Sequence, residues 1–217
     1  MTGRSFRALP ADQPLGFEIV SRSVLSDGFR PLERLEMRHD SLIGGEPLSV
    51  TRDVLRIGTA VVVLALYPAR DEIVVIRQFR VGAALSTPNA APLELPAGHL
   101  DAGESAEEAA RREFHEETGL RIEALAHAFT ILPSPGMSDE TVVVFLGLVS
   151  IPGELAPSGL AEENEEIMPI ALPVERLLEA VDEGRIHNGF LFAALNWFAR
   201  RGRAIAATLQ DSMRTPA

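Results

Sequence analysis

Three glutamates near the middle of the chain have the spacing expected of a divalent-cation site. Glu113, Glu116 and Glu117 lie at i, i+3 and i+4, so they project from one face of a helix. Three carboxylates on one stripe repel one another, and a bound cation removes that penalty. Magnesium takes hard oxygen ligands, typically a few carboxylates together with phosphate oxygens of a substrate. The stripe predicts either a magnesium site for a phosphate-containing substrate or a solvated acidic face, the more usual role of a Glu-rich helix.

The neighbouring residues favour the metal site, because they define a helix that can dock on a core. Ser105 is a natural N-cap, and Glu108 follows three residues later, which makes a capping box. The helix is expected to continue to Thr118 and to end at Gly119, a C-terminal signal. An apolar face for docking is supplied by Ala106, Ala109, Ala110 and Phe114.

Two further features would hold the glutamates in place. Arg112 stands beside the stripe and can grip a carboxylate through a bidentate contact. Gly98 and Gly103 bracket the turn into the helix, where the backbone must bend sharply. A general acidic scaffold needs neither feature.

The rest of the chain predicts the elements that must position this segment. Strands are expected over 17–25, 34–39, 47–55, 60–67, 72–79, 124–132 and 141–150, helices over 173–182 and 189–201, and a loop over 83–92. Strands with isolated helices, and no regular βαβ alternation, predict a mixed α+β fold. The last residues, 204–217, carry no readable signal.

The composition limits the possible partners. A formal net charge of −11 argues against nucleic acid and anionic membranes, because Lys and Arg carry such binding. The lack of cysteine excludes disulfides, thiolate zinc sites and cysteine nucleophiles. The N-terminal residues have no signal-peptide core, and the most apolar stretch, 59–67, is too short to span a bilayer. We therefore expect a soluble, cytoplasmic protein.

The stretch 98–120 resembles the Nudix box, G-x5-E-x7-R-E-U-x-E-E-x-G-U, where U is aliphatic or bulky and apolar. Every defined position is filled, by Gly98, Glu104, Arg112, Glu113, Phe114, Glu116, Glu117, Gly119 and Leu120. Phe114 is the loosest match, since that position is more often aliphatic. The resemblance implies an α/β/α sandwich around a mixed central sheet. It also implies a metal-dependent attack of water on a phosphorus of a nucleoside diphosphate linked to another group.

The resemblance implies a role for each residue of the box. Glu113 and Glu117 are expected to be direct metal ligands, and Glu116 a third ligand or a partner of the ligands with a part in catalysis. The positions expected to be structural are Gly98, Glu104, Arg112 and Gly119. The metal would be magnesium or manganese, with two or three ions present when substrate is bound.

Residues outside the box resemble the ADP-ribose pyrophosphatase branch of the family. The segment 93–98 matches the ELPAG lead-in of that branch, in which the carbonyl at Ala97 is a metal ligand. The segment 134–140 matches its SPG-x-S-x-E loop, in which the position of Pro135 marks ADP-ribose specificity. Glu140 would contact the terminal ribose. The alternative for Pro135 is an ordinary loop proline between two strands.

An acidic segment over 159–166 resembles a loop of the same branch that carries the catalytic base. The alignment places the base on Glu163 and a further metal contact on Glu165. A carboxylate on a mobile loop can close over bound substrate and take a proton from water. Neighbouring glutamates leave the register open by one position, and the alternative is an acidic loop without a fixed partner.

Besides Pro135 and Glu140, three residues are candidates for binding the substrate. Arg52 and Arg80 match arginines that bind phosphate and the ribose end in the branch, a role suited to the planar guanidinium fork. Arg77 competes with Arg80 for this role. Phe29 is the candidate platform for adenine stacking, with a small hydrophobic anchor as the alternative.

The resemblance also implies a division of the chain and a homodimer. Residues 1–57 would be a β-rich segment exchanged with a partner chain, 58–203 the Nudix hydrolase domain and 204–217 a C-terminal tail. The expected reaction is hydrolysis of ADP-ribose to AMP and ribose 5-phosphate. One alternative is another nucleotide sugar, such as GDP-mannose, and the other is a Nudix-fold regulator without turnover. Such regulators usually lose box glutamates, whereas all are present here.

Overall fold

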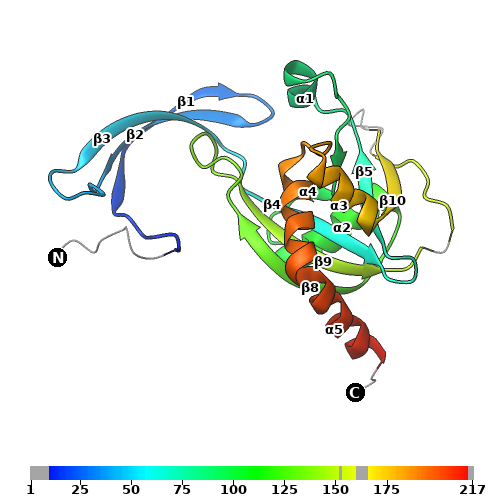
Figure 1. Ribbon diagram of the computed structural model, residues 1–217. Helices are drawn as coiled ribbons and strands as arrows, with labels where there is room; N and C mark the ends of the chain where they lie inside the picture. The colour runs from blue at the N-terminus through cyan, green and yellow to red at the C-terminus, as the bar shows by residue number, and fades with distance from the viewer. Residues whose placement is uncertain (1–9, 152, 160–165, 215–217) are drawn as a thin grey trace. The chain divides into compact units, whose positions relative to one another are not determined.

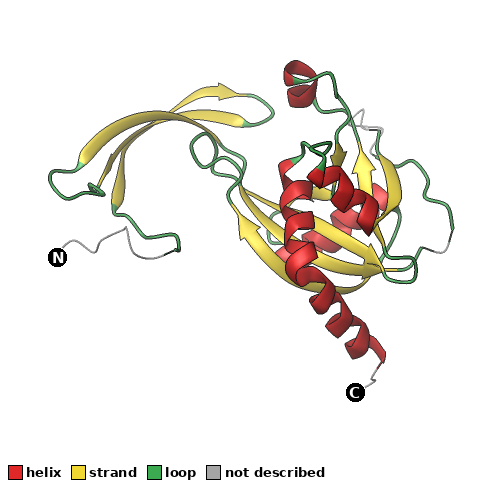
Figure 2. Cartoon of the chain, viewed as in Figure 1, coloured by secondary structure: helices red, strands yellow, loops and turns green. Residues whose placement is uncertain are grey.

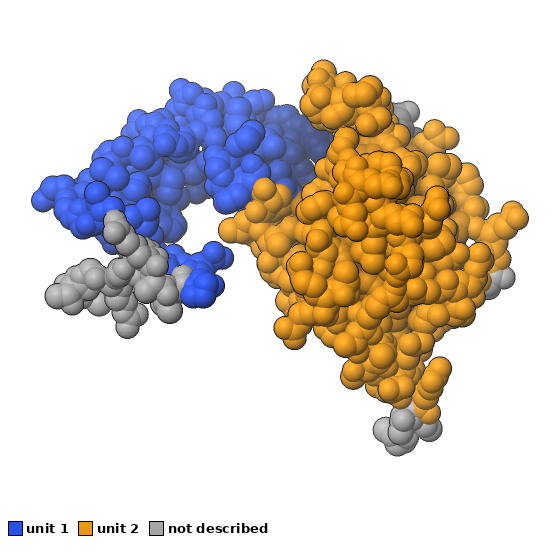
Figure 3. Space-filling view, in the orientation of Figure 1, with its two compact units in different colours: residues 1–58, 134–140 blue, residues 59–133, 141–217 orange. Residues whose placement is uncertain are grey.

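The computed structural model describes residues 10–151, 153–159 and 166–214. The chain divides into two compact units, coloured separately in Figure 3. The first contains residues 1–58 together with 134–140, and the second contains residues 59–133 together with 141–217.

The first unit is a three-stranded antiparallel sheet in the order β1-β2-β3 (Figure 1). Its strands are β1 (Phe17–Asp27), β2 (Pro31–His39) and β3 (Leu48–Leu55), which confirms three predicted strands with small changes at their ends. Every residue of β1 is exposed. Leu35 is the one buried residue among the described residues of this unit. The sheet therefore has almost no core of its own within the single chain.

The segment 134–140 is joined to the end of β3 by hydrogen bonds. The amide of Leu55 donates to the carbonyl of Met137, at 2.9 Å. The Asp139 carboxylate accepts from the amide of Ile57 at 2.6 Å and lies 2.8 Å from Nε of Arg56. Burial alone raises the pKa of Asp139, but these amides and the guanidinium outweigh it, so the pKa is lowered.

The second unit contains a mixed sheet with the strand order β10-β5-β4-β9-β8. These strands are β10 (Met168–Pro173), β5 (Glu72–Arg77), β4 (Thr59–Tyr67), β9 (Thr141–Val149) and β8 (Ile122–Ile131). Two short strands extend it, β6 (Leu93–Glu94) on β5 and β7 (Ala97–His99) on β4. The β4–β9 pair is parallel and the other pairs are antiparallel. The centre of β4 is buried on both faces, which explains its continuous apolar run.

Helices cover both faces of this sheet, as Figure 2 shows. On one face, α2 (Ala106–Thr118) packs its apolar stripe, including Phe114, against β4 residues Val61 and Val63. On the other face lie α3 (Val174–Asp182), α4 (Gly189–Trp197) and α5 (Arg203–Arg214). The α+β sandwich with a mixed sheet and an N-terminal β appendage is therefore confirmed. Among the described residues, none of the helices is long and apolar enough to cross a bilayer.

Besides the short strands β6 and β7, which were not predicted, the structure differs from the sequence-based expectation in three segments. A short helix, α1 (Val81–Ser86), occupies part of the expected loop. The strand β10 was not predicted, because Pro169 argues against a central strand; β10 lies at the edge of the sheet, where proline is tolerated. Residues 204–214, which belong to the segment expected to be a tail, form most of α5, and α5 continues from α4 through a π-helical turn over Phe198–Gly202.

Candidate active site

The helix α2 begins and ends where its sequence predicts. The Ser105 hydroxyl accepts from the amide of Glu108 at 3.3 Å, and the Glu108 carboxylate accepts from the Ser105 amide at 2.9 Å, so the capping box is complete. The hydrogen bond from the Ser105 hydroxyl, followed by that from its amide, lowers the pKa of Glu108. Gly119 ends the helix in the left-handed region, with φ of 72°.

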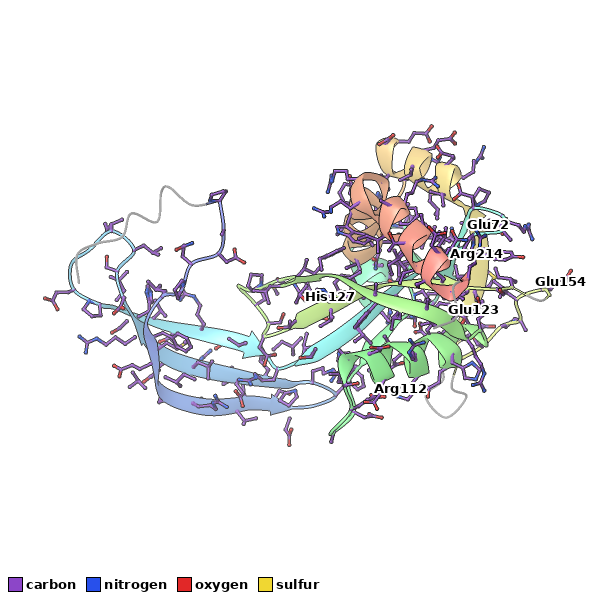
Figure 4. All side chains as sticks on the ribbon, turned by 90° about the horizontal axis from the view of Figure 1, so that it is seen from below. Glu72, Arg112, Glu123, His127, Glu154 and Arg214 are labelled. Atoms are coloured by element: carbon purple, nitrogen blue, oxygen red, sulfur yellow. The ribbon has the colours of Figure 1, made fainter. Side chains whose placement is uncertain are left out.

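Arg112 binds several carboxylates along one side of α2, where Figure 4 labels it. Its Nε and Nη2 donate to the two oxygens of Glu104 at 3.0 and 2.7 Å, a bidentate pair. Its Nη1 lies 2.9 Å from Glu113 and 3.3 Å from Glu116, and Nη2 also donates to the carbonyl of His99 at 3.0 Å. The hydrogen bonds from Arg112 are the main reason that the pKa of Glu104 is lowered. Arg112 thus ties the loop before α2 to the glutamate stripe.

Glu113 lies directly against the backbone of Gly98. A Cβ atom at Gly98 would come within 1.9 to 2.2 Å of the Glu113 carboxyl atoms, so only glycine leaves room for this carboxylate beside β7. Burial is the largest influence on Glu113 and raises its pKa, against the lowering effect of Arg112. The close approach gives a physical reason for glycine at the first position of the box.

Glu117 is buried, and it faces the same short strand. Its Oε2 accepts a hydrogen bond from the amide of Ala97 at 2.9 Å. The side chain of Glu116 is more open, at 43% exposure. The structure therefore brings Glu113 and Glu117 together with Ala97 and Gly98, while Glu116 lies at the outer side of the stripe beside Arg112.

The donor set at β7 and α2 suits a hard cation. Two carboxylates and a nearby backbone segment are of the ligand type that magnesium prefers, and Gly98 provides the space that one of them needs. Within 10–151, 153–159 and 166–214, however, the side chains include no ready-made group of three His, Asp or Glu arranged around one point. In the structure Glu113 is paired with Arg112, and Glu117 with a backbone amide.

Ser158, which the sequence did not single out, fixes the start of the acidic segment 159–166 against α2. The Ser158 hydroxyl donates to the carbonyl of Glu117. Ser158 and Ile167 also exchange backbone hydrogen bonds of 2.9 and 2.8 Å, which close the chain on either side of residues 159–166. The predicted base Glu163 and the predicted metal contact Glu165 lie outside the described residues. The paired residues Ser158 and Ile167, on either side of this segment, nevertheless lie at the end of α2 that carries Glu117.

Arg80 is held by a buried carboxylate that the sequence analysis did not assign. Its Nε and Nη2 both donate to Oε2 of Glu94, at 2.9 and 2.8 Å, and Nδ2 of Asn188 donates to Oε1 of the same residue at 3.1 Å. Glu94 is 5% exposed and stands between Leu93 and Leu95. A glutamate between two leucines in an apolar run was the feature of the sequence that could have identified Glu94 as a functional residue. Arg77, the competitor for the Arg80 role, donates to the carbonyl of Ala91 at 2.8 Å.

The remaining predicted substrate residues belong to the first unit. Phe29 is 95% exposed at the turn between β1 and β2, with the Arg30 guanidinium 5.0 Å from its ring centroid. Arg52 lies on β3 and donates to the carbonyl of Thr51. Pro135 and Glu140 lie in the segment 134–140, and burial raises the pKa of Glu140 against the opposing charge of Arg30.

Comparison with known proteins places this geometry in a family. The sequence matches the NUDIX domain model over residues 56–191. It is 36% identical over 183 residues to the ADP-ribose pyrophosphatase of Haemophilus influenzae, covering 83% of this chain and 84% of the relative. It is 35% identical over 188 residues to the ADP-ribose pyrophosphatase of Escherichia coli strain K12, covering 87% and 90%.

Two other comparisons are more distant. The GDP-mannose pyrophosphatase of Enterobacter sp. strain 638 is 29% identical over 190 residues, covering 87% of this chain and 97% of the relative. A crystal structure described as an ADP compounds hydrolase has a TM-score of 0.63 and 19% identity, covering 89% of this chain and all of that one, and it supports the fold. The family model spans more than half of the chain and includes the whole of the β7–α2 site. The chain therefore belongs to the Nudix hydrolase family, in the branch that contains the bacterial ADP-ribose pyrophosphatases.

Proposed function

We propose that this protein hydrolyses the pyrophosphate of ADP-ribose, with water, to AMP and ribose 5-phosphate. The observation that carries the proposal is the packing of Glu113 and Glu117 against Ala97 and Gly98. The substrate is suggested by relatives of 35–36% identity over most of the chain, which are named ADP-ribose pyrophosphatase.

In this proposal the metal is magnesium, or manganese, held by chain oxygens at β7 and α2. Glu113, Glu117 and the carbonyl of Ala97 would be direct ligands, with contributions from Glu116 and Glu165. Two or three ions are expected with substrate. When bound, the metal supplies neutralisation of the diphosphate charge and activation of water.

The chain's own residues orient the substrate and move the proton. Glu163 would accept the proton of the attacking water, and Glu116 would assist. Arg80 would bind a phosphate oxygen, with Glu94 fixing the direction of its guanidinium. Arg112 would not contact the substrate but would position Glu113 and Glu116, with which it forms ion pairs. Positioning and charge stabilisation of this kind supply most of the catalysis in phosphoryl-type transfer.

The first unit would complete the substrate site as part of a homodimer. Its sheet buries a single described residue within the chain, and exposed apolar side chains such as Phe17, Val20 and Val24 lie along β1. Burying such a surface against a second copy would be favourable. Phe29 would stack on adenine, Arg52 would bind phosphate or ribose, and Pro135 and Glu140 would contact the ribose end.

The proposed organisation is a swapped segment over 1–57, followed by a hydrolase domain. We place the protein in the cytoplasm, without nucleic-acid or membrane partners, on the basis of its charge of −11 and its lack of cysteine.

A second candidate substrate is GDP-mannose, because relatives named GDP-mannose pyrophosphatase match at 29–30% identity. The test is a panel of nucleoside diphosphate sugars assayed with magnesium, with products identified by mass. We expect ADP-ribose to have the highest kcat/KM and to give AMP and ribose 5-phosphate. A higher value for GDP-mannose would transfer the proposal to that substrate, and no turnover of any would reject it.

A further inference from the structure

Glu94 is a buried carboxylate whose two oxygens have different partners. It lies on β6, which pairs with β5, and it is 5% exposed. Its Oε2 accepts from Nε and Nη2 of Arg80, at 2.9 and 2.8 Å. Its Oε1 accepts from Nδ2 of Asn188, at 3.1 Å. Because a buried carboxylate is costly unless its oxygens are paired, both contacts contribute to holding it in place.

Asn188 is itself held at a fixed point, the N-cap of α4. Its Oδ1 accepts from the amide of Leu191 at 3.0 Å, so one amide group caps the helix with its oxygen and binds Glu94 with its nitrogen. Two nearby residues, Ile186 and Leu191, are buried in the core cluster on the face of the sheet opposite to α2 (Figure 1). The position of the Asn188 side chain is therefore set by the core and by the helix, independently of Glu94.

The contact with Asn188 fixes the direction in which Glu94 presents its other oxygen. The terminal torsion of a glutamate has no sharp staggered minima, so a carboxylate held at one oxygen alone is able to rotate. With Oε1 held by Asn188, Oε2 stays in line with Arg80. The Arg80 side chain is 44% exposed and that of Glu94 is 7% exposed, so a buried carboxylate directs a guanidinium that reaches the surface.

We propose that Asn188 is a positioning residue for the reaction, which sets the direction of the Arg80 guanidinium through Glu94. This inference rests on the proposed function, in which Arg80 binds a phosphate oxygen of the substrate. The planar fork of arginine has to face the oxygens that it binds, so its direction matters as well as its charge. Loss of the contact leaves the charge of Arg80 and the carboxylates of α2 in place, but it removes the restraint on that direction.

The test compares two substitutions in the full-length protein, with ADP-ribose and magnesium. Asn188→Ser keeps a helix cap of similar strength but is too short to reach Glu94, whereas Asn188→Ala loses both the cap and the contact. Asn196→Ser is the matched control, because Asn196 lies on the same helix and donates to the carbonyl of Phe192.

We expect kcat/KM to fall about ten-fold in both Asn188 variants, since hydrogen bonds to charged groups are individually strong. It should be unchanged in Asn196→Ser. The melting temperature should fall only in Asn188→Ala, which lacks the cap. Wild-type activity in Asn188→Ser, or a loss of activity that follows the melting temperature, would show that Asn188 is only a helix cap and would overturn the proposal.

A combination with Arg80→Lys shows whether Asn188 acts through Arg80. In the Arg80→Lys background, Asn188→Ser should cause little further loss of kcat/KM, because the group that Asn188 positions is already missing. A further loss as large as that in the wild-type background would mean that Asn188 acts directly on the substrate or on the helix. That result would also overturn the proposal.

A measurement without turnover separates this inference from the proposed function. The Nε–H of Arg80 is bound to Glu94 and should give a slowly exchanging NMR signal, identified by its absence from Arg80→Lys. The signal should shift and exchange faster in Asn188→Ser but not in Asn196→Ser. An unchanged signal in Asn188→Ser would overturn the inference even in an active enzyme. A changed signal in a protein that hydrolyses no nucleoside diphosphate sugar would support the link from Asn188 to Arg80 and reject the proposed function.

Discussion

At the scale of single residues, the approach of Glu113 to Gly98 is the tightest constraint at the candidate active site. The carboxylate occupies the space that a side chain at position 98 would need. Gly98 has no positive φ, so its role is space and not backbone freedom. Alanine there is compatible with the backbone but displaces the end of a flexible side chain.

This geometry predicts that Gly98→Ala separates activity from stability. The new methyl group should push Glu113 out of position, and misplacement by about 1 Å can cost on the order of a hundred-fold in rate. Magnesium-dependent turnover should therefore fall steeply, while the melting temperature changes little. The control is Gly153→Ala, because a Cβ there meets nothing within 4 Å. Full activity of Gly98→Ala would show that the position of Glu113 is unimportant.

The Glu104–Arg112 pair predicts a pH-dependent contribution to stability. The folded pKa of Glu104 is lowered by Arg112, so the contribution is complete above the unfolded value of about 4.3 and is lost as pH falls through the lower folded value. Glu104→Gln should lower the melting temperature at pH 7, and its difference from the wild type should shrink as the pH approaches 3.5. A difference that stays constant between pH 7 and pH 3.5 would contradict this account.

How much of the site could be predicted depends on whether the contacts are local. The stripe, the capping box and the position of Arg112 follow from spacing within one helix. The partners Glu94–Arg80 and Ser158–Glu117 are 14 and 41 residues apart, and only the folded sheet brings them together. No pattern in a single sequence reports such long-range pairs.

At the scale of elements, a hydrogen bond from Ser158 to α2, here called the tether, positions the residue that precedes the acidic segment. Ser158 pairs with Ile167 and binds the carbonyl of Glu117. In the proposed reaction this tether holds Ser158, just before the acidic segment, next to the helix that carries the glutamate stripe.

Removal of the tether should affect catalysis more than folding. Ser158→Ala is expected to lower kcat about ten-fold, because a proton acceptor must lie within hydrogen-bonding reach of its water. Ser158→Thr keeps the hydroxyl and should retain most of the activity. Equal kcat values for the wild type and Ser158→Ala would show that this hydrogen bond does not affect catalysis. An equally low kcat in Ser158→Thr would show that the hydroxyl is not the cause of the loss.

The elements themselves were predictable where periodicity was strong and local signals agreed. The capped helix α2 and the apolar strands β4 and β5 were of this kind. The strand β10 was missed because its two prolines resemble a loop, and pairing with β5 overrides that preference at a sheet edge. The helix α5 was missed because its few apolar residues give no clear pattern in the sequence. Their role is evident only in the folded protein, where Ile205 and Leu209 pack on the core.

At the scale of the whole molecule, the described residues of the first unit have almost no core within one chain, since Leu35 alone among them is buried. A three-stranded sheet needs a covered hydrophobic face for stability. The proposed homodimer supplies that cover and would explain why residues with candidate substrate roles, such as Phe29 and Arg52, lie in this unit.

The dimer proposal predicts that a charge on β1 changes the oligomeric state. Val20 is 63% exposed in the single chain, so Val20→Glu should be harmless to a monomer but should disrupt a dimer that buries β1. Sedimentation velocity should show the wild type at twice the mass of one chain and the variant at lower mass. Met213→Glu, an exposed position on α5, is the control. A wild-type monomer, or a variant that dimerises as well as the wild type, would contradict the prediction.

The proposed action of the α2 carboxylates through magnesium on ADP-ribose is tested by measuring ADP-ribose turnover as a function of magnesium concentration. The wild type should require magnesium, and Glu117→Gln should lose about a hundred-fold or more in kcat/KM because a metal ligand is missing, with an unchanged circular dichroism spectrum. Glu107→Gln, an exposed position on the same helix, should behave as the wild type. Turnover that is independent of magnesium, or that is the same in Glu117→Gln and Glu107→Gln, would contradict the claim.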